Sequence, residues 1–256
     1  MDTWKDLSRK LVAETAGTFT IVGLGCGVVC AAKYAKSPLT PFGIAATWGM
    51  GVTLAVYATR DISGAHLNPA ITAAVAVNNP SMPLSHSGAY VAAQTFGATL
   101  AGGMNYAIFK RGIAALEAEE KLRRGARGSA SLYNGAFGMV PNTSIVRTAA
   151  GALAVEVACT GIFGFLVFAL TNEKSSVPAA ASPPLIGTAV AALVAIFGPV
   201  TGCGMNPARD LGPRFVTAMA GWGKIAGSRA WIYSVGPVAG AVLGGAAYKE
   251  LLGSSF

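Results

Sequence analysis

Six long apolar runs constrain the fold of this chain more than any other feature. A helix that crosses the hydrocarbon core of a bilayer needs about 20 mostly apolar residues. Six segments approach that length: residues 11–31, 41–58, 88–109, 148–170, 183–198 and 231–251. Inside a bilayer every backbone polar group must bond within the protein, and a helix satisfies this condition by itself. The sequence therefore predicts an all-α membrane protein with six transmembrane helices.

The composition favours a packed membrane bundle over a water-soluble domain. Of the 256 residues, 53% are hydrophobic and only 12% are charged, about half the charged share of a typical soluble domain. Glycine is in excess, with 33 residues, and small residues let membrane helices approach closely. The net charge of +8 is spread over the segments between apolar runs, so we expect no nucleic-acid partner.

Two further apolar segments are too short to cross the bilayer. They cover residues 67–77 and 205–220, and near the start of each stands the triplet Asn-Pro-Ala: Asn68, Pro69, Ala70 and Asn206, Pro207, Ala208. Proline fits the first position of a helix, where its missing N–H would have no partner, and asparagine is a good N-cap. Each segment is predicted to be a half-helix that enters the membrane and returns.

The two halves of the chain match each other. Asn68 corresponds to Asn206 and Glu14 to Glu156, at an offset of roughly 140 residues. Because each half has an odd number of spans, the second copy must be inverted relative to the first, and broken helices at matching places of an inverted repeat indicate a site at the membrane midplane. The chain is thus predicted to be one transmembrane domain, residues 1–256, in three parts: repeat 1 at about 8–109, a solvated loop with a short charged helix at 110–147, and repeat 2 at about 148–252.

The two asparagines predict the chemistry of that site. If they meet at the midplane, two positive helix ends and two amide NH2 groups point at one spot. This arrangement favours a neutral molecule with an oxygen lone pair, repels cations, and interrupts the chain of water molecules along which protons hop. Arg209 follows the second triplet, and an arginine in the membrane is costly unless it lines an aqueous path. We expect it to line the pore.

Other polar residues near the triplets are expected to support the loops. Glu14 and Glu156 lie inside predicted helices, where each carboxylate needs donors, and backbone N–H groups of the re-entrant loops can supply them. His66 precedes the first triplet and is interpreted as loop support. Asp210 follows Arg209 and is interpreted as one half of an ion pair that holds the second loop.

Both loops resemble the signature loops of the aquaporin family, also called major intrinsic proteins. The similar segments are residues 63–70, Ser-Gly-Ala-His-Leu-Asn-Pro-Ala, and residues 202–210, Gly-Cys-Gly-Met-Asn-Pro-Ala-Arg-Asp. The resemblance covers nearly the whole chain. It implies an aquaporin-like bundle of six tilted helices and two half-helices, with one pore per subunit and four subunits in a homotetramer.

The resemblance also implies four residues for the narrowest part of the pore, the selectivity filter: Trp48, Val194, Cys203 and Arg209. Water-selective members usually have histidine where Val194 stands, and an aliphatic side chain there suits carbon-bearing solutes. Asp210 with Arg214 also resembles the glycerol-conducting branch, whereas Cys203 and Tyr233 resemble water channels. The expected function is a passive channel for water and small uncharged solutes such as glycerol.

Three other functions compete with this one. A water-selective channel is the main alternative, and a secondary transporter is a remote one because inverted repeats also occur there. A structural junction protein has no support in the loops beyond the length of the 110–147 connection. With two histidines, no Ser-His-Asp constellation and no metal-ligand cluster, we expect neither an enzyme nor a cofactor.

The distribution of positive charge conflicts with the orientation that the resemblance implies. Six spans put both termini on one side, and the resemblance implies the cytoplasm, most simply at the plasma membrane, with an internal membrane as the alternative. That side would carry six of the 19 Lys and Arg residues: Lys5, Arg9, Lys10, Arg60, Lys174 and Lys249. Positive residues usually favour the cytoplasmic side, so charge alone would predict the reverse orientation.

Overall fold

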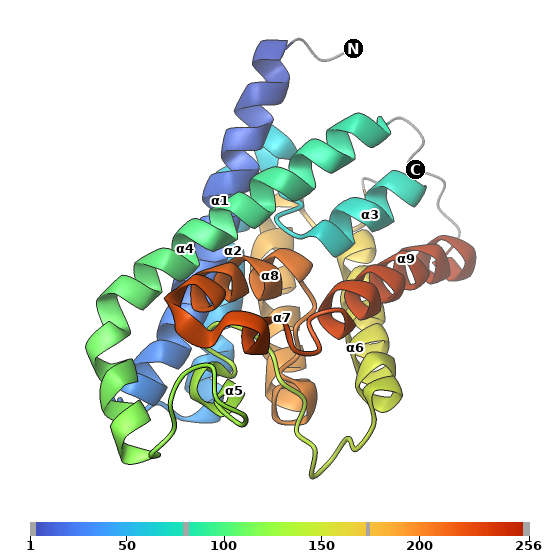
Figure 1. Cartoon of the computed structure of the whole chain (residues 1–256). Coiled ribbons are helices and arrows are strands. Elements are labelled where there is room, and N and C mark those ends of the chain that lie inside the picture. The colour runs from blue at the N-terminus through green and yellow to red at the C-terminus, as the bar shows by residue number, and fades with distance from the viewer. Residues whose placement is uncertain (1–3, 79–81, 173–174, 253–256) are drawn as a thin grey trace.

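The computed structural model describes residues 4–78, 82–172 and 175–252, and these ranges are almost entirely helical (Figure 1). Lys174, one of the six positive residues counted above, lies outside these described ranges. Within the described ranges there are six long helices: α1 (Trp4–Tyr34), α2 (Pro41–Ser63), α4 (Leu84–Glu119), α6 (Ala149–Thr171), α7 (Ser182–Thr201) and α9 (Ile232–Leu252). The shorter α-helices there are α3 (Pro69–Asn78), α5 (Ala130–Tyr133) and α8 (Pro207–Thr217). The long helices correspond to the six predicted spans.

Most of the long helices are apolar enough to cross a membrane by composition alone. Four described helices satisfy this criterion without a partner, namely α1, α2, α6, and α7 with the short turn before it, and α9 satisfies it together with the bent segment Pro207–Gly227. Helix α4 does not, because its middle contains Gln94 and Asn105. Both are buried, and they bond inside the bundle: Gln94 Nε2 donates to a Glu14 oxygen at 2.7 Å and Asn105 Nδ2 to the Gly23 carbonyl at 3.2 Å.

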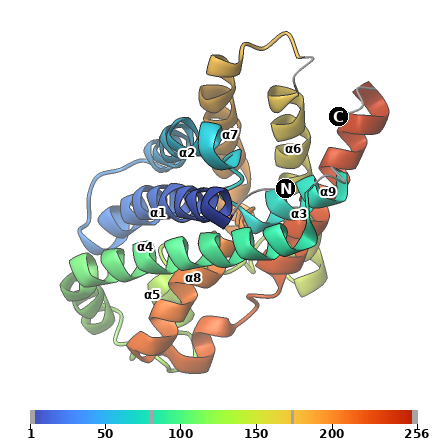
Figure 2. The same ribbon diagram turned by 90° about the horizontal axis from the view of Figure 1, so that it is seen from above.

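The packing of the helices repeats with the chain halves. Helix α1 packs against α4 as α6 packs against α9, and α1 against α2 as α6 against α7. Each half-helix packs against the last long helix of the other half, α3 against α9 and α8 against α4. Figures 1 and 2 show these exchanged positions from two directions. The architecture is the predicted all-α inverted repeat.

Glycine at matched positions permits the closest of these contacts. A Cβ atom on Gly97 of α4 would lie 2.2 Å from the Thr15 carbonyl oxygen of α1, and one on Gly240 of α9 would lie 2.4 Å from the Val157 carbonyl oxygen of α6. No real Cβ atom fits at such distances. The two helix crossings therefore depend on these glycines.

The connection at residues 110–147 differs from the predicted solvated loop. Helix α4 continues through its first part to Glu119, and α5, the short helix, is uncharged. Residues 129–140 fold back into the protein, where Leu132, Tyr133 and Phe137 are buried. The Tyr133 hydroxyl donates to the Ile225 carbonyl at 2.8 Å. For residues 129–140 the prediction was wrong, because their apolar side chains form a second core with the ends of α1 and α4. Residues 110–128 are mostly exposed and begin with the charged end of α4.

Most charged residues of the connection are exposed, whereas Arg124 and Glu117 are partly buried and form an ion pair. Arg124 donates to both carboxylate oxygens of Glu117, at 2.6 and 2.7 Å, and its guanidinium lies 4.7 Å from the centre of the Trp222 ring. Its hydrogen bonds to Glu117 raise the pKa of Arg124 above its usual value.

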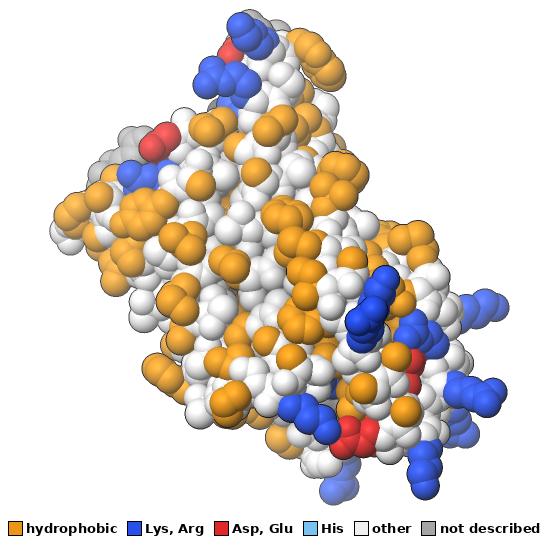
Figure 3. Space-filling model, turned by 90° about the vertical axis from the view of Figure 1, so that its left-hand side faces the viewer, with side chains coloured by type: hydrophobic (Ala, Val, Ile, Leu, Met, Phe, Trp, Pro, Cys, Tyr) orange, Lys and Arg blue, Asp and Glu red, His pale blue; other side chains and the backbone are white. Residues whose placement is uncertain are grey.

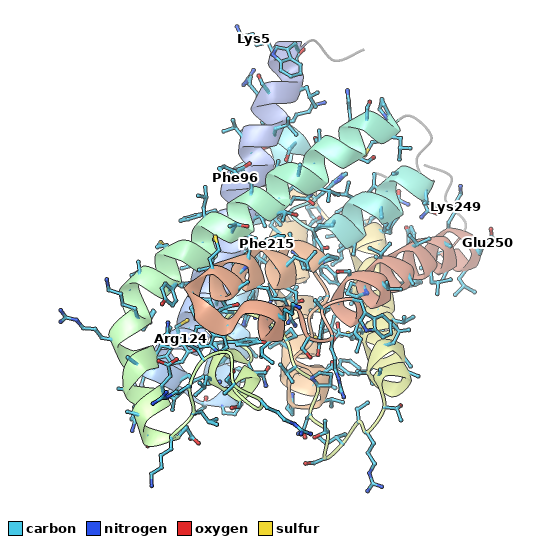
Figure 4. The ribbon with its side chains drawn as sticks, viewed as in Figure 1. Lys5, Phe96, Arg124, Phe215, Lys249 and Glu250 are labelled. Carbon is cyan, nitrogen blue, oxygen red and sulfur yellow. The ribbon has the colours of Figure 1, made fainter. Side chains whose placement is uncertain are left out.

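The surface has the pattern of a membrane protein. On the face in Figure 3, apolar side chains cover the middle, while most Lys, Arg, Asp and Glu side chains gather at the two ends. Figure 4 shows Lys5 at one end and Arg124 at the other, with Phe96 of α4 and Phe215 of α8 between them. Both phenylalanines are more than half exposed, as expected for side chains that face lipid or another subunit.

Candidate functional site

A cavity of about 720 Å³ lies in the middle of the bundle. The two loops that precede α3 and α8 form part of its wall, and all four residues of the expected filter line it: Trp48, Val194, Cys203 and Arg209. The rest of the lining is largely apolar, including Ile21, Phe163 and Ile186. The chain alone thus forms a hollow with a few polar groups in an apolar wall.

Asn68 and Asn206 meet in this cavity in a symmetric arrangement. Asn68 Oδ1 accepts from the Ala70 N–H at 2.8 Å, and Asn206 Oδ1 accepts from the Ala208 N–H at 3.0 Å. Each amide nitrogen donates across to the opposite loop: Asn68 Nδ2 to the Met205 carbonyl at 2.9 Å and Asn206 Nδ2 to the Leu67 carbonyl at 2.8 Å. An amide NH2 has two N–H groups, so one from each asparagine remains for a molecule in the cavity.

The backbone of the two loops follows one conformational pattern. Each long helix before a loop ends at a glycine with positive φ, Gly64 or Gly202. Two further residues in each loop then have positive φ: Ala65 and Leu67 at 51° and 52°, Cys203 and Met205 at 53° and 48°. Such conformations cost about 1–3 kcal/mol each in residues other than glycine. They persist only where other contacts hold the loop.

Glu14 holds the first loop. Its Oε1 accepts from the Ser63 hydroxyl at 2.6 Å and the His66 N–H at 3.0 Å. Its Oε2 accepts from the Leu67 N–H and from Gln94 Nε2, both at 2.7 Å. Four donors thus surround a fully buried carboxylate. The N–H groups of the loop face the glutamate, and the carbonyl groups can face the cavity.

Glu156 holds the second loop in the same way. Its Oε1 accepts from the Thr201 hydroxyl at 2.6 Å and the Gly204 N–H at 3.1 Å, and its Oε2 accepts from the Met205 N–H at 3.2 Å. A tyrosine fixes the start of each loop, since Tyr90 donates to the Ser63 carbonyl at 2.9 Å and Tyr233 to the Thr201 carbonyl at 2.6 Å.

Arg209 and Trp48 lie against each other in the cavity wall, one polar and one aromatic. The Arg209 guanidinium carbon lies 4.6 Å from the centre of the Trp48 ring, and Arg209 Nη2 donates to the Gly135 carbonyl at 2.7 Å. Its Nη1 is buried without a hydrogen-bond partner in the described part of the chain. Gly25 makes room for the indole, because a Cβ atom there would lie 2.2 Å from the ring.

His66 belongs to the first loop, and Asp210 lies in α8 directly after the second loop. His66 lines the cavity, and its Nδ1 lies 3.2 Å from the Thr72 hydroxyl. Asp210 pairs with Arg214, whose Nε donates to Asp210 Oδ2 at 2.6 Å, while Asp210 Oδ1 accepts from the Met139 N–H at 2.7 Å. Asp210 thus joins α8 to the folded part of the connection.

Sequence reasoning missed several residues that take part in the site. Gln94 was not predicted to take part in the site. Its place inside an apolar run was the available signal, because a glutamine there needs a buried partner. Gly135 and Met139 contribute backbone groups to Arg209 and to the Asp210–Arg214 pair. No side-chain pattern marks such backbone positions.

Comparison with known proteins identifies the family. The family model described as major intrinsic protein matches residues 1–248. The chain belongs to the major intrinsic protein family. It is accordingly a channel protein rather than an enzyme. In the part of the chain that the structure describes, no group of three or more His, Cys, Asp or Glu residues could hold a metal ion.

Several relatives are similar over nearly their full length. The glycerol uptake facilitator protein of Haemophilus influenzae is 38% identical, with 98% of this chain and 96% of that protein covered. The protein of the same name from Escherichia coli is 35% identical, with 99% and 91% covered. The propanediol uptake facilitator PduF of Citrobacter freundii is 37% identical, with 97% and 94% covered.

A solved structure has the same fold. The aquaglyceroporin of Plasmodium falciparum superposes with a TM-score of 0.82, with 96% of this chain and 97% of that chain covered. Because the two sequences are only 24% identical, this similarity supports the fold alone. The fold of this chain is aquaporin-like.

Proposed function

We propose that this protein is a passive channel for glycerol and similar small uncharged solutes, and for water. The observation that carries the proposal is the composition of the cavity wall, where Arg209, whose Nη1 is buried without a hydrogen-bond partner among the described residues, lies over the Trp48 ring and lines the cavity together with Val194. Relatives named for glycerol and propanediol uptake, 34–38% identical to this chain, support it.

The polar and the apolar side of the cavity wall match the two edges of a polyol. Glycerol has hydroxyl groups along one edge and C–H groups along the other. Hydroxyl oxygens accept hydrogen bonds from Arg209 Nη1 and then from the free N–H groups of Asn68 and Asn206. The C–H edge packs on the Trp48 ring and Val194. A histidine in place of Val194 would narrow this apolar side and favour water.

Ions and protons are excluded by positive charge and by the direction of the hydrogen bonds. Arg209 and the N-terminal ends of α3 and α8 present positive charge to the cavity, so a cation loses hydration without gaining a partner. A water molecule bonded to both asparagines must turn its oxygen toward them. This orientation interrupts proton transfer along the water file.

A water-selective channel and a secondary transporter would each need other residues at this site. A water-selective channel requires a constriction too polar and narrow for carbon, which Val194 does not supply. A secondary transporter requires a titratable group that couples to the solute at the midplane. Here the midplane groups are amides, while Glu14 and Glu156 accept three or four hydrogen bonds each from the protein.

The assembly and location are part of the proposal. Four chains form a homotetramer in the plasma membrane, with both termini in the cytoplasm and one pore in each chain. Exposed apolar side chains such as Phe96 and Phe215 supply faces for lipid or for neighbouring subunits.

Uptake of labelled glycerol into proteoliposomes distinguishes a channel from a transporter. The expected result is equilibration to equal concentrations on both sides, at a rate that no proton or sodium gradient changes. Accumulation above the external concentration in an applied gradient would contradict the channel. Empty liposomes measure the lipid background.

A further inference from the structure

The connection between α4 and α6 leaves the lipid region near Ile108 and returns to it near Ile145. Ile108 is 62% exposed and Ile145 is 56% exposed. The structure describes every residue between them, and among these residues no large apolar side chain is exposed. Because exposed apolar side chains suit lipid rather than water, the part of the connection between these two positions lies outside the hydrocarbon core.

The length of α4 agrees with this boundary. Its 36 residues span about 54 Å at 1.5 Å per residue, whereas the hydrocarbon core of a bilayer is about 30 Å thick. Part of α4 therefore extends beyond the core. Its C-terminal part does so at the end of the molecule where Figure 4 shows Arg124.

Three positive residues stand directly beside the boundary. Lys110 and Arg111 follow Ile108 on α4, and Arg147 follows Ile145 before α6. All three are exposed, and none of their side chains makes a hydrogen bond or ion pair with a described residue. Such side chains lay their aliphatic stems along apolar surface and keep the charge in the polar layer. We call these three residues the boundary cations.

Nearby acidic residues are mostly paired with other partners. Glu117 accepts from Arg124 at 2.6 Å, and Glu119 pairs with Lys36 at 2.9 Å. The remaining acidic residue of the connection is Glu120. The charge of the boundary cations is therefore largely uncompensated by the protein.

Conduction of neutral solutes gives these charges no role. A field of fixed charges steers charged molecules toward a protein, but glycerol and water are neutral. Moreover, the boundary cations are not among the residues that line the cavity. Their partner is therefore expected outside the pore, at the surface of the membrane.

We propose that the boundary cations bind the phosphate groups of anionic phospholipids in the leaflet at this end of the channel. The two surfaces are complementary in charge, and the exposed isoleucines place the cations at the depth of the lipid headgroups. A lysine or arginine near an anionic membrane surface strengthens binding by about fivefold, which corresponds to about 1 kcal/mol. The proposal holds whichever side of the membrane this end faces.

The middle of the same connection supplies a matched control. Lys121, Arg123 and Arg127 are exposed, and their side chains make no hydrogen bond or ion pair with the described residues. They differ from the boundary cations in position, since no exposed large apolar side chain stands close to them in the chain.

The experiment measures lipid binding to the purified full-length channel in a neutral detergent. Native mass spectrometry counts the lipids that each protein retains as phosphatidylglycerol or phosphatidylcholine with the same acyl chains is added. The boundary variant combines Lys110→Gln, Arg111→Gln and Arg147→Gln. The control variant combines Lys121→Gln, Arg123→Gln and Arg127→Gln, so both lose the same charge. A further arm adds excess inorganic phosphate to the parent.

The parent should bind phosphatidylglycerol more tightly than phosphatidylcholine, and high salt should reduce the difference because it screens exposed charges. The boundary variant should bind phosphatidylglycerol at least about 25-fold more weakly, about fivefold for each of the adjacent Lys110 and Arg111. The control variant should bind it like the parent. Both variants should melt at the parent's temperature without lipid, since the changed side chains have no protein partner.

Three results would overturn the proposal. The first is a parent that binds both lipids equally, which tests the idea without any variant. The second is a boundary variant that binds phosphatidylglycerol as tightly as the control variant, which would leave these cations for an acidic protein partner. The third is displacement of phosphatidylglycerol from the parent by inorganic phosphate, which would indicate a site for a free anion.

Discussion

At the residue scale, Arg209 concentrates the chemistry of the pore. The sequence indicates that it lines the cavity, and the structure adds which of its atoms are occupied. Nη2 donates to the Gly135 carbonyl and the guanidinium lies over Trp48, while Nη1 has no hydrogen-bond partner among the described residues. In the proposed function, this charged group has a structural bond through Nη2 and donates to the solute through Nη1.

Removal of this charge should open the pore to cations. Two unit charges 4 Å apart repel by about 4 kcal/mol at an effective dielectric constant of 20, a barrier of roughly a thousandfold. Arg209→Val should therefore show cation current in planar bilayers where the parent shows none. Arg111→Ala, at an exposed position, is the control. An Arg209→Val channel that carries no current at any potential would mean that the helix ends exclude cations without Arg209.

Val194 should set the preference between glycerol and water. Val194→His adds bulk and a polar group, so the ratio of glycerol to water permeability should fall by about tenfold, the effect of a change near 1.4 kcal/mol at one pocket contact. Val194→Thr keeps the shape and replaces one methyl group by a hydroxyl, and should lower the ratio less. Stopped-flow measurements on both variants test this, and equal ratios for all three proteins would remove Val194 from the filter.

At the scale of elements, the two re-entrant loops are strained backbones that buried glutamates hold in place. Each loop has three residues with positive φ, and two consecutive N–H groups of the same loop donate to Glu14 or Glu156. The carboxylates compensate for the strain because hydrogen bonds to a charged acceptor contribute about 1.5–3 kcal/mol each.

Replacement of either glutamate by glutamine should destabilise the fold. A glutamine has an NH2 group in place of one carboxylate oxygen, and this group faces donors of the protein. Two hydrogen bonds are then lost, so Glu14→Gln should lower the free energy of unfolding by about 3 kcal/mol, at about 1.5 kcal/mol for each bond. Glu156→Gln should cost less, because three strong donors face Glu156 and four face Glu14. Thermal unfolding in detergent measures both. A Glu14→Gln protein as stable as the parent would contradict the account of the loops.

The helix crossings give a second prediction at this scale. Gly97→Ala and Gly240→Ala place a methyl group against backbone of the neighbouring helix, and each should destabilise the protein by about 1–3 kcal/mol as overpacking does. Gly103→Ala is the matched control in α4, since a Cβ atom there meets nothing within 4 Å. The same thermal assay applies, and equal melting temperatures for the Gly97 and Gly103 variants would be the contrary result.

The helices that could be predicted from the sequence are those marked by a pattern in neighbouring residues. Apolar length marks the long helices, and Asn-Pro at a cap marks the starts of α3 and α8. The fold of residues 129–140 was not predictable in this way, because Leu132, Tyr133 and Phe137 show no periodicity and their partners on α1 and α4 are distant in the chain. The partner of Asp210 was left open for a similar reason. Arg209 and Arg214 are both close in sequence, and only the helical turn places Arg214 against Asp210.

At the scale of the whole molecule, one chain contains the complete site. Residues of both loops and both half-helices, and all four residues of the expected filter, line one cavity within a single chain. Assembly into a homotetramer would therefore multiply pores without sharing one.

This separation of pores predicts how mixed assemblies behave. If active subunits are mixed with a conduction-deficient variant that still folds, glycerol flux should fall in proportion to the active fraction. A pore shared among four chains would instead lose flux as a steep power of that fraction. Reconstitution at several defined ratios, with protein content fixed, distinguishes a straight line from a steep curve.

The most direct test of the central claim is stopped-flow light scattering on proteoliposomes exposed first to an impermeant sugar and then to glycerol. We expect shrinkage in sugar and fast re-swelling in glycerol, many times faster than in empty liposomes. Fast water flux without glycerol re-entry would contradict the account, and would mean that Cys203 and Tyr233, rather than Val194, indicate what this pore conducts.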